Sequence, residues 1–139
     1  MSEKYNQSEQ SKVLMEQVYK KDGTLINLLQ DVDVETGDNY IKFSNGILIC
    51  WGYPYQVTDV NIKWGSLYYC YLNDVVQFPI PFIYYPVVNL TCQNAGVICA
   101  TLSSNGYTKS GINQVMITSA EPQSDYGFNL HYIAIGRWK

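Results

Sequence analysis

Residue types that perform catalysis are scarce in this sequence of 139 residues. Beyond residue 43 the acidic side chains and histidines amount to Asp59, Asp74, Glu121, Asp125 and His131. No nucleophile elbow, phosphate-binding loop or HExxH motif occurs. Glycoside cleavage requires paired carboxylates, and so few acids leave little to pair, which puts a glycan depolymerase far behind other interpretations. We therefore expect a binding or structural protein, with no enzymatic activity and no cofactor.

The cysteines do not form a pattern typical of a metal site. Cys50, Cys70, Cys92 and Cys99 each lie in an apolar run, and no two of them make a CxxC pair. Zinc sites need clustered ligands at short spacing, so no metal is expected. The polar N-terminus lacks the apolar core of a signal peptide, which favours four buried, reduced thiols over disulfides.

Length and charge narrow the classes of partner. The chain is 47% hydrophobic, which suits one domain with a short appendage. The net charge is −3 and no basic cluster occurs, so nucleic acid is not an expected partner. No apolar run reaches membrane-spanning length, so membrane insertion is not expected either. Thirteen tyrosines exceed what one small core hides easily, and several should lie at a surface or a subunit interface.

The elements that would position these residues are strands. The C-terminal stretch Phe128–Lys139 alternates with a period of two, and both parities are apolar around Tyr132–Ile135. That pattern predicts a strand buried on both faces at its middle. Ala134 and Gly136 are small, so a bulky group should pack against them.

Earlier segments add a hairpin and further short strands. Tyr40–Phe43 and Ile47–Trp51 flank Ser44-Asn45-Gly46, which is a strong hairpin signal. Further strands are expected over Leu67–Leu72, Val75–Phe82, Pro86–Cys92, Val97–Leu102 and Gln114–Thr118. Two prolines place the Val75–Phe82 strand at a sheet edge or end it at Phe78, and Phe78 and Phe82 beside them are expected to anchor this strand end over the core. A polar loop or weak strand is expected over Gln56–Gly65, a turn at Asn73-Asp74, and a loop over Glu121–Gly127.

The spacing predicts an all-β fold, an antiparallel two-sheet β-sandwich of about six to seven strands over residues 41–139. Residues 1–40 differ in being rich in charge. There we expect a helix over Ser8–Lys21, a possible strand over Thr24–Leu29 and a solvated acidic loop over Asp31–Asp38. This N-terminal segment would serve as an attachment or trimer-axis segment.

Five motifs in order resemble a known family. They are Phe43–Gly52, Val76–Phe82, Tyr85–Val88, Asn105–Tyr107 and Tyr132–Gly136. Together they resemble the C-terminal, receptor-binding tip domain of bacteriophage tail fibres, and the second half is similar to H-type lectins. Tyr132 and Tyr107 stand where that family has Trp and Phe, and no fibre-shaft repeat occurs.

The resemblance implies a homotrimeric β-sandwich in a virion tail that binds host cell-surface glycan and joins other tail proteins through its N-terminal segment. The alternative is a structural virion or baseplate component without glycan binding, whose tyrosines fill subunit interfaces. The family's sugar-binding residues do not map onto this chain one by one.

A sugar site needs an exposed aromatic face beside side-chain hydrogen-bond partners. The candidates for that site are Tyr107 after a turn, Tyr126 in a polar loop, and His131 with Arg137 on one parity of the last strand. His131 and Arg137 would equally well bond backbone or carboxylate groups across a subunit boundary.

Overall fold

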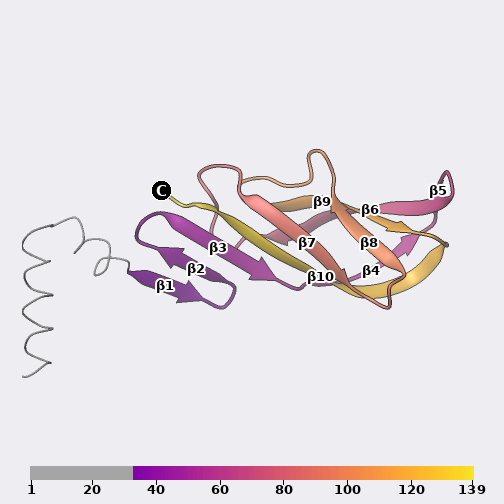
Figure 1. The fold of residues 1–139 in the computed structure, drawn as a ribbon, viewed down its shortest axis with the longest axis horizontal. Coiled ribbons are helices and arrows are strands. Elements are labelled where there is room, and N and C mark those ends of the chain that lie inside the picture. Colours follow the sequence, from indigo (N-terminus) through magenta and orange to yellow (C-terminus); the bar gives the residue numbers. More distant parts are fainter. Residues whose placement is uncertain (1–32) are drawn as a thin grey trace, which may run out of the picture. The chain divides into compact units, whose positions relative to one another are not determined.

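The structure is a computed structural model that describes residues 33–139. The helix expected over Ser8–Lys21, the strand over Thr24–Leu29 and the attachment role of that segment lie outside the described residues. The described chain forms ten β-strands and no helix, arranged as two antiparallel sheets (Figure 1). The predicted all-β, two-sheet sandwich is thereby confirmed. One compact unit comprises Glu35–Lys139.

We call the six-stranded sheet "sheet A" and the four-stranded sheet "sheet B". Sheet A contains β1 (Val34–Gly37), β2 (Tyr40–Phe43), β3 (Ile47–Gly52), β4 (Tyr55–Val60), β7 (Val87–Gln93) and β10 (Gln123–Arg137). Sheet B contains β5 (Ile62–Trp64), β6 (Leu67–Gln77), β8 (Ile98–Leu102) and β9 (Gly111–Ser119).

Strand β10 joins most of sheet A. It pairs with β7 along one edge and with β3 and then β4 along the other (Figure 1). Gly52 of β3 lies opposite Tyr132, and Tyr55 of β4 lies opposite Asn129, so the register does not change between the two strands. Strands β3 and β4 are therefore one long strand interrupted at Tyr53-Pro54.

The predicted last strand exists, but only one of its faces is buried. Its inward residues are all buried, namely Phe128, Leu130, Tyr132 and Ala134. The side chains of Ile133 and Ile135 are 42% and 43% exposed. The expectation of burial on both faces is thus wrong, because the described chain places a second layer, sheet B, against one face of sheet A.

Strand β6 passes through the turn expected at Asn73-Asp74. Asp74 has φ of 51°, and the pairing with β9 shifts register between Asn73 and Val76, so the local structure is a β-bulge. Leu72 and Val75 are both buried although three positions separate them. The bulge changes the side-chain parity, which keeps apolar residues inward on both sides of it.

Three expected loops contain strands. Gln56–Gly65 contains most of β4 and all of β5, the C-terminal part of Asp31–Asp38 forms β1, and Glu121–Gly127 contains the start of β10. Most side chains in β1, β5 and the start of β10 are exposed. Polar residues suit such positions on either face, so β1 and the start of β10 lack the apolar alternation that marks a half-buried strand. Strand β5 does alternate, as Ile62-Lys63-Trp64, but over three residues only. Asp125, with φ of 47°, marks a second bulge there.

The Asn-Gly hairpin and the phenylalanine anchors match expectation. Gly46 has φ of 97°, and its N–H donates to the Phe43 carbonyl at 2.9 Å in the turn between β2 and β3. Phe78 and Phe82 are buried and pack edge to face, with ring centroids 5.3 Å apart. A Cβ at Gly136 would lie 2.7 Å from the Phe82 ring, which confirms the bulky partner expected beside this glycine.

The cysteines are all free thiols, but only two of them are buried. Cys50 and Cys70 are buried, Cys92 is half-buried and Cys99 is exposed on β8, which corrects the expectation of four buried thiols. Burial raises the pKa of both Cys50 and Cys92 to about 11.

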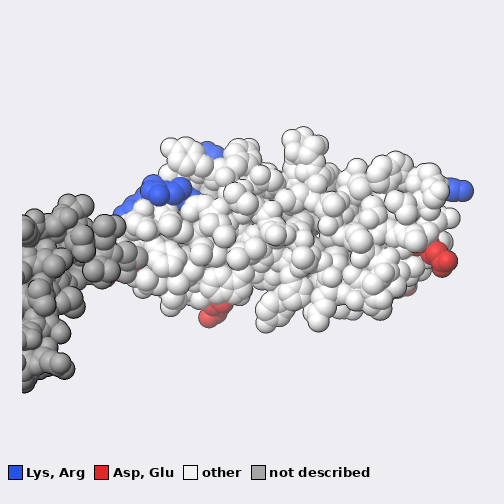
Figure 2. Space-filling view, in the orientation of Figure 1, with Lys and Arg blue, Asp and Glu red and all other residues white. Residues whose placement is uncertain are grey.

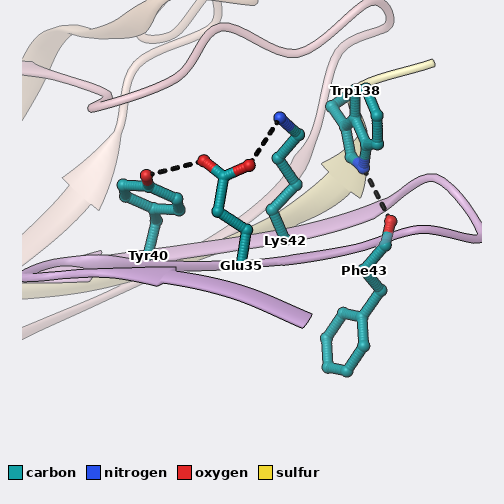
Figure 3. A network of polar contacts seen from close by, with 5 residues as sticks. All are labelled: Glu35, Tyr40, Lys42, Phe43 and Trp138. Carbon is teal, nitrogen blue, oxygen red and sulfur yellow. Dashed lines mark hydrogen bonds and ion pairs between the residues drawn. The ribbon is translucent and has the colours of Figure 1, made fainter. Parts of the chain in front are cut away.

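A polar network ties the margin of sheet A to the last residues (Figure 3). Glu35 accepts hydrogen bonds from the Tyr40 hydroxyl at 3.0 Å and from Lys42 Nζ at 3.2 Å. The Trp138 indole N–H donates to the Phe43 carbonyl at 2.8 Å, and Lys42 Nζ lies 4.1 Å from the Trp138 ring centroid. These contacts join β1 and β2 to the chain beyond β10.

Candidate functional site

An aromatic hollow lies on the outer face of sheet B. Its volume is about 270 Å³, and it is lined by Trp64 of β5, Tyr69 and Tyr71 of β6, and Met116 of β9. Trp64 is 55% exposed and Tyr71 is 46% exposed. We call this site the "aromatic hollow".

A tight hairpin places the tryptophan beside the tyrosines. Gly65, with φ of 60°, turns β5 into β6, so that Trp64 pairs with Leu67 and Ile62 pairs with Tyr69. The Trp64 and Tyr69 rings then meet edge to face, with centroids 6.2 Å apart and planes at 76°. The alternation of a strand puts Tyr71 on the same face as Tyr69, and these rings meet at 5.5 Å and 75°. Because the rings meet edge to face, the walls of the hollow stand at steep angles to one another.

Neutral polar groups lie next to the rings. Beyond Tyr71 on the same face, Gln114 Nε2 donates to Asn73 Oδ1 at 3.0 Å. Thr118 lies opposite Tyr69 on the neighbouring strand. Exposed charged residues adjoin this region at Lys63, next to Trp64, and at Asp74, next to Asn73. The outward residues of the three longer strands that lie between them carry no formal charge, and they are Leu67, Tyr69, Tyr71, Asn73, Cys99, Thr101, Gln114, Met116 and Thr118.

This combination suits a neutral sugar better than other small ligands. The C–H faces of a pyranose ring pack on aromatic rings, and its hydroxyls both donate to and accept from amides and threonine hydroxyls. A carboxylated or phosphorylated ligand would find no cation on the outward residues just named. The hollow is a surface depression, which matches a shallow binding mode.

Two of the four sequence-predicted site residues lie away from this hollow, in packed surroundings. Tyr107 is half-buried between β8 and β9, with its ring edge-on to Tyr85 at 6.0 Å. Tyr126 lies opposite Thr58 in the β10–β4 pair and packs partly against the core. Its predicted position in a loop is corrected to a strand.

The other two candidates lie on the outer face of sheet A. His131 Nε2 is 3.0 Å from Gln93 Oε1, and its ring stacks on Tyr53 with centroids 5.9 Å apart. Arg137 is exposed and its Nε donates to the carbonyl of Lys139. Six residues of extended strand separate His131 from Arg137, about 20 Å. The four candidates therefore do not converge on one site, and a binding role for each stays a prediction.

A second hollow adjoins Tyr53. Its volume is about 360 Å³, and Asn39, Gln77 and Tyr132 contribute to its lining. Burial raises the pKa of Tyr132 to about 12, so this phenol stays protonated at neutral pH. Only Tyr53 presents an exposed aromatic ring here, whereas three rings meet in the aromatic hollow. The aromatic hollow is therefore the stronger candidate for a sugar site.

Sequence reasoning missed the aromatic hollow, although a signal for it exists. Tyr69 and Tyr71 have the same parity within Leu67–Leu72, and Trp64 precedes them by one Gly-Ser turn. The expectation over Gln56–Gly65 is a polar loop or a weak strand, without a turn at Gly65-Ser66 that would pair Trp64 with the next strand. Recognising the Gly65-Ser66 hairpin would have put all three rings on one face.

Residues 33–139 contain no group of three or more His, Cys, Asp or Glu side chains arranged to hold a metal ion. No helix long and apolar enough to cross a membrane occurs in this part of the chain.

No protein-family model matches this chain, and neither the curated proteins nor the solved structures give a significant match. The resemblance to tail-fibre tips and H-type lectins therefore stays a prediction.

Proposed function

We propose that this protein is a receptor-binding tip domain of a phage tail fibre, which acts as a homotrimer and binds a neutral saccharide of the host cell surface. The aromatic hollow is the observation that carries this proposal. Three aromatic rings beside neutral amide and hydroxyl groups offer what a sugar needs, and few other uncharged ligands need both.

Two further observations support it. The chain folds as the antiparallel sandwich that the five-motif resemblance implies. A single shallow sugar site binds weakly, and three copies on one particle would raise the apparent affinity by multivalency. Trimerisation would therefore raise the apparent affinity of the protein for a dense glycan surface.

One observation favours the alternative function, a structural virion component that binds no glycan. Large apolar side chains are also exposed on sheet A, as they would be in a virion component that only packs against other subunits. In that case the tyrosines would be contact residues and no glycan would bind. Mutation of the aromatic hollow distinguishes these two functions.

The experiment is a glycan array followed by titration calorimetry with the best neutral oligosaccharide. Trp64→Ala and Tyr71→Ala each remove one wall of the hollow and should weaken binding by roughly tenfold or more. Tyr84→Ala is the matched control, because Tyr84 is 67% exposed and is not among the residues that line either hollow. Equal loss in all three variants, or no glycan bound by the wild type, would contradict the proposal.

The same array separates the aromatic hollow from the sequence-predicted candidates. Tyr107→Ala and His131→Ala should leave saccharide binding unchanged if the hollow is the site. If they remove binding while Trp64→Ala does not, the site lies with the sequence-predicted residues instead. Light scattering on each variant shows whether the oligomer has survived.

A further inference from the structure

The outer face of sheet A exposes an unusual amount of apolar surface. Seven large side chains on this face are at least 36% exposed, namely Ile47, Tyr53, Tyr55, Val57, Val87, Ile133 and Ile135. They belong to three neighbouring lines of the sheet: β3, the Tyr53-Pro54 joint and β4 run in line along one edge of β10, and β7 pairs with its other edge. We call this surface the "sheet A face".

Its centre is a flat aliphatic area. In the register of the sheet, Ile135 lies between Ile49 of β3 and Val87 of β7, and Ile133 lies between Trp51 and Asn89. β-Branched side chains in adjacent strands pack into a smooth surface without a hollow of their own. No charged side chain stands in these two rows.

Polar and charged groups border this centre. Arg137 lies one row beyond Ile135 along β10. On the other side of Ile133, two rows carry the polar residues His131 with Thr91 and Asn129 with Gln93, and the exposed Asp59 lies near the end of β4. On the broad side of the domain seen in Figure 2, the lysine, arginine and acidic side chains likewise lie at the margins. A face without central charge offers nothing to a polyanion or a basic peptide, but it suits another apolar protein surface.

The exposed area matches a stable protein interface. Applying the exposed fractions to about 150–250 Å² per large side chain gives roughly 600–900 Å² for the seven residues. A standard interface buries about 800 Å² on each partner.

We infer that copies of this chain pack against one another through the sheet A face. The partner must present an apolar surface that is uncharged at its centre, and other copies of the same chain supply such a surface. In a closed ring of three copies these faces would surround the three-fold axis, and each copy would contact both of the others. The inference rests on the homotrimer within the proposed function and names the surface that forms it. The aromatic hollow, on the other sheet, would stay open in that assembly.

The test compares single lysine substitutions by sedimentation or light scattering. Val87→Lys introduces a charge on edge strand β7. The Val87 side chain is 76% exposed in the single chain, so replacing it should lower the free energy of unfolding only slightly. Ile133→Lys does the same at the centre. Leu67→Lys on sheet B is the matched control, since Leu67 is 41% exposed and Ile133 is 42% exposed.

We expect a wild-type trimer, a Leu67→Lys trimer, and monomeric Val87→Lys and Ile133→Lys proteins at micromolar concentration. Thermal unfolding scans establish that each variant is folded. If Ile133→Lys does not fold, the oligomeric state of Val87→Lys alone tests whether the sheet A face forms the interface. An oligomer that persists in both sheet A variants overturns this inference and leaves the proposed function standing. A monomeric wild type overturns both the homotrimer and this interface.

Saccharide binding provides an independent readout. A monomeric Val87→Lys protein should bind a soluble oligosaccharide with unchanged affinity, because its aromatic hollow is intact. Its binding to a dense glycan surface should fall by at least roughly tenfold, because multivalency is lost. Loss of soluble binding in the monomer would overturn the separation of the two surfaces.

Discussion

The outer faces of the two sheets are both apolar, yet they differ in kind. Sheet A presents isoleucine and valine at the centre of its face, with Ile133 and Ile135 there, and carries Tyr53 and Tyr55 further along the same side. Sheet B presents tryptophan and tyrosine around a hollow, with Asn73 and Gln114 beside it. Aliphatic flatness suits a protein partner, whereas angled rings beside neutral polar groups suit a sugar. Exposed hydrophobicity alone therefore does not say what a surface binds.

The sheets differ also in how they are assembled. Sheet B joins β5, β6, β9 and β8 each to its neighbour. In sheet A one strand, β10, pairs with β3, β4 and β7. Damage to β10 should consequently affect the whole domain, whereas damage at the β5 end of sheet B should stay local.

The largest expected effect follows from removing part of β10. Deleting Tyr132–Lys139 removes the residues that pair with β3 and most of those that pair with β7, so we expect no soluble, cooperatively folding protein. Solubility and a thermal unfolding scan measure this. The comparison variant Ile62→Asp, at the margin of sheet B, should keep a cooperative transition. A truncated protein that melts cooperatively would show that sheet A does not depend on β10.

Adjacent residues of β10 separate its two faces. Ala134→Trp should lower the free energy of unfolding by about 3 kcal/mol or more, because Ala134 is fully buried and the core cannot expand freely. Ile133→Trp should change it by less than about 0.5 kcal/mol when measured on the monomeric Val87→Lys background. Urea denaturation provides both values, and similar losses at the two positions would contradict the assigned faces.

Alkaline pH probes the inner face of sheet A. The pKa values of Cys50 and Cys92 are raised from 9.0 to about 11 by burial, so the unfolded chain releases these protons first. The contribution of each protonated thiol to the free energy of unfolding is fully present below pH 9. It is lost as the pH rises through 11, and the loss is about 2–3 kcal/mol per thiol at most. Urea unfolding under reducing conditions at both pH values tests this. Cys92→Ala should show a smaller loss, and a flat profile would argue against burial as the cause.

The smallest effect is expected at the margin of sheet A. The pKa of Glu35 is lowered, first by the hydrogen bond from Tyr40 and then by Lys42, but the carboxylate is fully solvated. Solvent screens such pairs, so Glu35→Gln should leave the thermal midpoint within error of the wild type. A clear drop in the midpoint would mean that the network in Figure 3 stabilises the sheet more than its exposure suggests.

The fold was predictable where apolar residues alternate between turn signals. The Asn-Gly hairpin, the Phe78 and Phe82 anchors and the last strand follow directly from sequence. Parity alone could not tell whether Ile133 and Ile135 face a second layer or solvent, because an interface and a core use the same residues. The bulge at Asp74 was not predicted, because the alternation of apolar and polar side chains changes phase there, and in a sequence such a change looks like a turn between two strands.

The candidate site was predictable only in part. Sequence indicated that exposed tyrosines would matter, and Tyr53, Tyr55, Tyr71, Tyr84 and Tyr85 are indeed exposed. It did not say which of them gather, because the aromatic hollow depends on the pairing of β5, β6 and β9. The pairing of His131 with Gln93 likewise joins residues 38 positions apart.

The unbroken register across Tyr53-Pro54 restricts how this chain could change its length. The N–H of Leu130 donates to the Pro54 carbonyl, so even the interruption between β3 and β4 is fixed to β10. A gain or loss of one codon here would exchange the two sides of β4, turning Tyr55 inward and Val60 outward. A change of two codons would preserve sidedness. At this joint, an odd change in length is therefore compatible with the fold only where a β-bulge restores the sidedness, as the bulge at Asp74 does in β6.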